Sequence, residues 1–199
     1  MRLFLKYLIA SCFLCLPQIA SAHSPIKGMG HFLNGVLHPL LVPEQVLLLL
    51  GLGLFYGQHQ PNQHKKNILY FMLAVIIGLF TSYFLQSQSI DISLPLLIIA
   101  LIINFFIIIR RDFYPPVLTL LMLIGGLLLG LDSAQAELMG KARLVTLFGS
   151  GIGMYFLMIY TMALSESFST QAWRIIAVRI LASWLSASAL MVLALRFAQ

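Results

Sequence analysis

One stretch of the sequence, residues 28–54, is apolar but contains side chains that can bind a metal ion. Within GMGHFLNGVLHPLLVPEQVLLLLGLGL these polar residues are His31, Asn34, His38, Glu44 and Gln45. Polar and ionisable groups inside a membrane are costly, and they tend to mark a site or a pathway. An imidazole facing a carboxylate is a ligand pair that suits a divalent transition metal. The alternative is a wet helix end near the membrane surface, where His31 and Asn34 only make hydrogen bonds.

The same stretch predicts a broken helix that would position these groups. Three of the polar residues fall at helical spacing on one face, namely His31, Asn34 and His38. Pro39 and Pro43 each remove an amide donor and crowd a preceding carbonyl, so one straight helix is not expected. We expect a short helix ending near His38, a bend over residues 39–42, and a second helix starting at Pro43. Its first turn would hold Glu44 and Gln45, where the helix dipole favours a carboxylate.

The composition of the chain indicates an integral membrane protein. Of the 199 residues, 60% are hydrophobic and only 9% are charged, against about 25% charged residues in soluble domains. The net charge of +6 is therefore interpreted as a signal for membrane topology and lipid contact. No basic cluster is interleaved with aromatic residues, so a nucleic-acid partner is not expected.

The first 22 residues resemble an export signal. A basic start, MRLFLK, precedes the apolar run YLIASCFLCL, and the sequence Ala20-Ser21-Ala22 follows as a cleavage site. Residues 1–22 would then be the signal peptide and residues 23–199 the mature transmembrane domain. Cys12 and Cys15 would leave with the signal. A rival route is lipoprotein processing at Ile9-Ala10-Ser11-Cys12.

The mature chain is predicted to be all-α, with six transmembrane helices at about 31–57, 67–86, 92–110, 114–131, 143–165 and 174–197. Basic residues in alternate connectors predict a multi-pass protein of the bacterial inner membrane with both mature termini in the periplasm. Its partners would be the lipid bilayer and an ion, and a homo-oligomer or a larger membrane complex is also compatible with the sequence. Glycines at packing spacing, Gly126 with Gly130 and the trio Gly149, Gly151 and Gly153, predict close helix contacts.

The broken span also carries a family motif. The pattern F-x-x-G-x-x-H-P, present as Phe32, Gly35, His38 and Pro39, resembles the HupE/UreJ family of nickel and cobalt permeases. The family signature continues as x-x-G-x-D-H, and the matched residues here are Val42, Glu44 and Gln45. The fourth span of the family reads H-G-x-A-H-G-x-E, and the matched residues here are Gly125, Gly126, Leu129, Gly130 and Asp132.

The resemblance implies a six-span permease for a divalent transition metal, which would be a substrate and not a resident cofactor. The metal ligands that the resemblance suggests are His38, Glu44, Gln45 and Asp132. The residue pattern adds two more candidates, His31 and the new amino-terminal residue His23. Asn34 would line the approach. Three matched positions lack the imidazole of the family, and carboxylate and amide oxygens suit harder ions than nickel.

A second function is also compatible with this sequence: a non-transporting membrane subunit that assists a metalloenzyme or a respiratory complex. The missing imidazoles and the glycine-rich helix faces favour it. An enzyme is not expected, because the mature chain has no H-E-x-x-H, no G-x-S-x-G and no cysteine.

Overall fold

The computed structural model describes residues 28–59, 64–84, 91–109, 114–133, 138–168 and 171–198, and in these ranges every regular element is an α-helix. The helices are α2 (His31–Leu41), α3 (Pro43–His59), α4 (His64–Phe84), α5 (Ser93–Ile109), α6 (Pro115–Asp132), α7 (Gly140–Ser167) and α8 (Ala172–Phe197). The predicted signal peptide and His23 lie outside the described residues.

The first span is broken, as predicted, with the bend inside residues 39–42 and the second helix starting at Pro43, but the first helix ends later than the predicted His38. Helix α2 continues through Pro39 to Leu41, and its axis meets that of α3 at 72°. The bend is at Val42, which is extended with φ −92° and ψ 111°. Pro43 causes this, because its ring disfavours a helical conformation for the residue before it. Pro39 leaves α2 intact, since the Val42 amide still donates to the His38 carbonyl at 3.1 Å.

The number of membrane spans is four or five by helix length and composition. Residues Lys66–Phe84 of α4, together with α6, α7 and α8, are each long and apolar enough to cross a bilayer. Helices α2 and α3 meet that standard only as one bent pair, and α5 is shorter, at 17 residues. The chain is therefore an all-helical, multi-pass membrane protein in contact with lipid, and the predicted sixth span remains a prediction.

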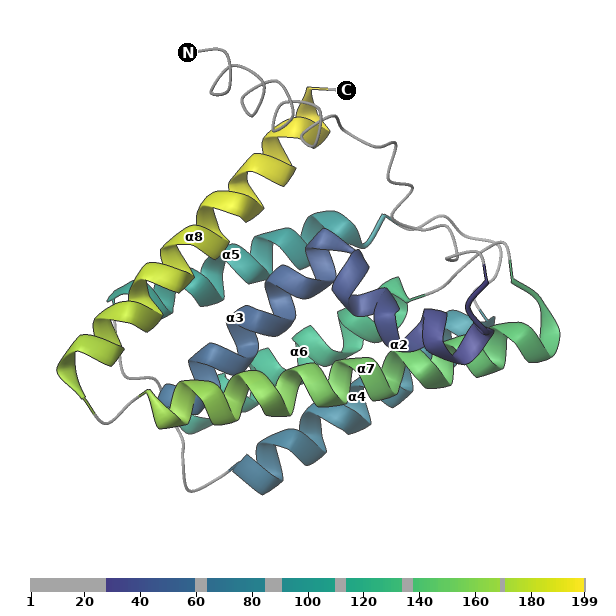
Figure 1. The fold of residues 1–199 in the computed structure, drawn as a ribbon, viewed down its shortest axis with the longest axis horizontal. Coiled ribbons are helices and arrows are strands. Elements are labelled where there is room, and N and C mark those ends of the chain that lie inside the picture. The colour runs from purple at the N-terminus through teal and green to yellow at the C-terminus, as the bar shows by residue number, and fades with distance from the viewer. Residues whose placement is uncertain are drawn as a thin grey trace, which may run out of the picture.

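Helix α7 is the element against which the broken span packs. Figure 1 shows α2 lying along α7, and α3 and α4 also contact α7. Glycines permit the close approach of α2: a Cβ on Gly149 would meet the Phe32 carbonyl oxygen, and one on Gly153 would meet that of Val36. On the other side of the bundle, α4 packs on α6 with Gly78 against Gly130. The predicted role of the glycines in helix packing is confirmed at these positions.

Helix α8 packs mainly on α5, and an ion pair joins their outer parts. The Arg196 Nη1 lies 2.9 Å from the Asp91 Oδ1, with the two side chains 33% and 61% exposed. Because exposed pairs contribute about 0–1 kcal/mol, we expect Asp91→Asn to lower the melting temperature by less than about 4 °C. Asparagine keeps an oxygen for the Ser93 amide, which donates to Asp91 Oδ1 at 3.2 Å. Thermal unfolding in detergent measures the shift, and a larger loss would contradict this account.

Candidate polar site at the break

The break brings one polar side chain of α3 against the end of α6. Gln45, in the first turn of α3, is fully buried, and its Nε2 donates to Asp132 Oδ2 at 2.8 Å. Asp132 is the last residue of α6 and is half-buried. The Gln45 Oε1 accepts no hydrogen bond from the described residues. A buried amide group and a half-buried carboxylate therefore lie together, and the oxygens of both are ligands that a cation can use.

The polar face predicted for α2 is only partly buried. Asn34 and His38 are buried at 6% and 3% exposure, whereas His31, at the first turn, is exposed. Asn34 Nδ2 donates to the Met29 carbonyl at 3.0 Å, which ties the start of α2 to the residues before it. The His31 carbonyl accepts from the Thr146 hydroxyl at 3.2 Å. His38 lies one turn before the bend, so α2 carries a buried imidazole that is close in sequence to Gln45 of α3.

Glu44 is half-buried in the first turn of α3, where it was predicted. Among the described residues, no three His, Cys, Asp or Glu side chains lie close enough together to hold a metal ion. Of the predicted site residues, Gln45 and Asp132 are joined by a direct hydrogen bond. The metal-binding roles of His38, Glu44, Asp132, His31 and Gln45, and the lining role of Asn34, remain predictions. His23 lies outside the described residues.

Further along the two helices from Gln45 and Asp132, the contact between α3 and α6 is apolar. Leu129 is fully buried one turn before the end of α6. A Cβ on Gly125 would lie 2.9 Å from Leu52 Cδ1, so the leucine of α3 occupies the space beside the glycine. These are the two α6 positions at which the family pattern has histidine. The polar pair is therefore followed along α6 by a closely packed apolar layer.

The structure also buries polar residues that the sequence pattern did not identify. Arg143 is 1% exposed, and its Nη2 donates to the Ser82 carbonyl at 2.6 Å. Its guanidinium lies 5.7 Å from the Tyr83 ring centroid, and its Nε and Nη1 have no hydrogen-bond partner among the described residues. Thr146 and Ser150 follow on the same buried face of α7. Arg143, Thr146 and Ser150 are three and four residues apart, and this helical spacing was the signal in the sequence for a shared polar face.

Comparison with protein families gives one match over most of the chain. A family model described as HupE / UreJ protein matches residues 11–195. Comparison with the curated proteins and with the solved structures gives no match.

Proposed function

Because the chain belongs to the HupE/UreJ family, we propose that it is a membrane permease for a divalent transition-metal ion, with nickel or cobalt as the substrates that the family suggests. The observation that carries the proposal is the partly buried hydrogen bond between Gln45 and Asp132 beside the bend of the broken span. Discontinuous helices place side chains and backbone carbonyls around ions within membranes. Buried polar groups at such a break are hard to explain by packing alone.

In this mechanism the ion reaches the bend between α2 and α3 and exchanges part of its water for protein oxygens and an imidazole. His38, Glu44 and Asp132 would be the ligands, and Gln45 would hold the Asp132 carboxylate in place through its Nε2. Passage beyond this point needs the Leu52 and Gly125 layer to open, so transport requires α3 and α6 to move apart. The chain has no nucleotide-binding loop, so an ion gradient or the membrane potential would drive the ion.

The topology that goes with this function is an inner-membrane location with both mature termini in the periplasm. The bend would then lie toward the periplasm, because α2 begins the first span of the mature chain. The chain would carry out no chemical reaction on its substrate.

Metal binding to the purified mature protein tests the site directly. We expect the wild type to bind nickel or cobalt saturably, and we expect His38→Ala and Glu44→Gln each to weaken binding by about tenfold or more, the scale of losing one metal ligand or its support. Mass spectrometry counts the bound metal, with zinc, copper and manganese as competitors. The mechanism places His38 among the ligands and not the exposed His31 of the same helix, so His31→Ala is the matched control for His38→Ala.

Two results would contradict the permease. One is an absence of saturable metal binding by the wild type under conditions in which a fully liganded member of the family binds metal. The other is metal uptake into vesicles that His38→Ala leaves unchanged. Equal loss in His31→Ala and His38→Ala would also contradict the predicted position of the site.

One observation favours a second candidate, a non-transporting accessory subunit. The described residues hold no group of three metal-binding side chains, and Leu52 and Leu129 pack where a permeation path beyond Asp132 would run. A scaffold of this kind would purify with a larger membrane complex and carry no flux. Copurification in mild detergent, measured beside the uptake assay, distinguishes the two functions.

A further inference from the structure

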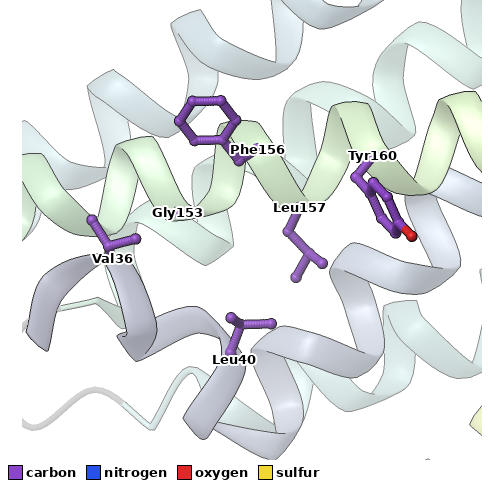
Figure 2. Close-up of a pocket in the computed structure, with 6 residues that line it drawn as sticks. All are labelled: Val36, Leu40, Gly153, Phe156, Leu157 and Tyr160. Atoms are coloured by element: carbon purple, nitrogen blue, oxygen red, sulfur yellow. The ribbon is translucent and has the colours of Figure 1, made fainter. Parts of the chain in front are cut away.

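An apolar groove lies between α2 and the middle of α7. It has a volume of about 340 Å³. Figure 2 shows the residues that line it, which are Val36, Leu40, Gly153, Phe156, Leu157 and Tyr160. Apart from the Tyr160 hydroxyl, these side chains are hydrocarbon. The groove is beside the last turns of α2, immediately before the bend at Val42.

The groove is continuous with the surface that faces lipid. Leu40, Phe156 and Tyr160 are 48%, 63% and 69% exposed, and they belong to helices that cross the membrane. Water would be a poor occupant, because a buried water needs two to four polar partners and this groove offers one hydroxyl. A hydrocarbon chain gains dispersion contacts there that an empty groove forfeits. The apolar lining therefore favours an acyl chain over water as the occupant of the groove.

The face of α7 that bears the groove continues to the end of the helix. Gly153, Tyr160 and Ser167 are each seven residues apart, so they share one face, and the exposed Leu164 lies between the last two. At 1.5 Å per residue, the distance from Gly153 to Ser167 along the axis is about 21 Å. Half of the hydrocarbon core of a bilayer is about 15 Å thick. An acyl chain in the groove therefore places its headgroup near the end of α7.

A cation is held at that end. Arg174 Nη1 donates to the Ser167 carbonyl at 3.1 Å, and the guanidinium lies 5.5 Å and 5.4 Å from the ring centroids of Phe168 and Trp173. That bond uses one of its five donors. Trp173 is 61% exposed, as is typical of aromatic residues at the membrane surface. Glu166 is also exposed here, but it points about 100° away from Ser167 around the helix.

We infer that this face of α7 is a binding site for an anionic glycerophospholipid, with the phosphate at Arg174 and one acyl chain in the groove beside Leu40. The inference is independent of metal transport, since it uses only the lipid-facing surface. The bound chain packs against the last turn of α2, so the lipid supports the bent form of the broken span.

Native mass spectrometry of the full-length protein, with phosphatidylglycerol or phosphatidylcholine added in equal amounts, tests this site. We expect the wild type to retain one phosphatidylglycerol with a preference of about fivefold, the scale of one arginine near an anionic headgroup. Leu40→Trp fills the groove and should remove retention of both lipids. Arg174→Gln should keep lipid binding but abolish the preference for phosphatidylglycerol.

Matched controls separate the site from general effects of mutation. Leu41→Trp changes a neighbouring side chain that is 45% exposed and does not line the groove, and it should bind as the wild type does. Arg179→Gln removes another arginine of α8 that caps a helix end, through its 2.8 Å bond to the Ile108 carbonyl, and it should keep the preference. Equal lipid retention by Leu40→Trp and wild type would overturn the assignment of the groove as the acyl-chain site. An unchanged preference in Arg174→Gln overturns the headgroup position, even if Leu40→Trp fails to fold.

Discussion

Gly149→Ala is expected to lower the melting temperature of the detergent-purified protein by about 2–12 °C, whereas Gly151→Ala leaves it unchanged or raises it. A methyl group on Gly149 would meet the Phe32 carbonyl oxygen of α2, which is backbone and cannot turn aside. Overpacking of this kind costs about 1–3 kcal/mol. For a chain of this length, each kcal/mol shifts the melting temperature by about 2–4 °C.

Gly151 is the matched control, because it lies two residues along the same helix. The nearest atom to a Cβ there is Leu79 Cδ1 at 3.1 Å, the end of a flexible side chain. Alanine at this position also gains up to about 1 kcal/mol of helix propensity over glycine. Thermal unfolding followed by circular dichroism compares the two variants. Equal losses would mean that the close approach of α2 to α7 does not limit stability.

The helices themselves were predictable from the sequence because apolar length and proline position determine them. The broken first span, with Glu44 in the first turn of α3, follows from Pro43 and the dipole preference of a carboxylate. The end of α2 did not follow, because the helix was expected to stop near His38 and continues to Leu41. A proline inside a helix costs one hydrogen bond, and whether the helix continues depends on packing around it, which for Pro39 includes Gly153 of α7.

The sequence did not predict which neighbouring helix each helix face packs against. Three glycines of α7 form one pattern, yet Gly149 and Gly153 face α2 while Gly151 faces Leu79 of α4. The same limit applies to Arg143, the first residue of a predicted span, whose burial against the end of α4 depends on how the two helices pack. Such features arise from tertiary contacts between segments far apart in the chain, and one sequence contains no direct record of them.

Two residues of the candidate site could be named from the sequence, but their contact could not. Gln45 and Asp132 were both named from the sequence, but their hydrogen bond joins positions 87 residues apart and depends on how α3 packs on α6. The sequence also suggested that several ligands would gather, and the described residues bring this one pair into hydrogen-bond contact. The chemistry of that pair, two kinds of oxygen and no imidazole, makes a specific prediction about selectivity.

Gln45→His is expected to bind nickel about tenfold more tightly than the wild type does, with little gain for manganese. The substitution places an imidazole beside the Asp132 carboxylate, at a position where the family pattern has histidine. Nickel gains most from imidazole nitrogen, whereas manganese prefers oxygen ligands. A supported ligand changes metal affinity by about 10–100-fold. Competition titrations with the two ions, on protein purified at one pH, measure the ratio.

Gln45→Leu supplies the contrast, since leucine preserves bulk in this fully buried position and removes both polar atoms. Asp132 then loses the donor that Gln45 Nε2 provides, and binding of either ion should fall below that of the wild type. If Gln45→His and Gln45→Leu behave alike toward both ions, position 45 does not contact the metal, and the site must be sought around His38. A rise for nickel in Gln45→His alone places the ion between α3 and α6, because the side chain at position 45 is the one change between the proteins.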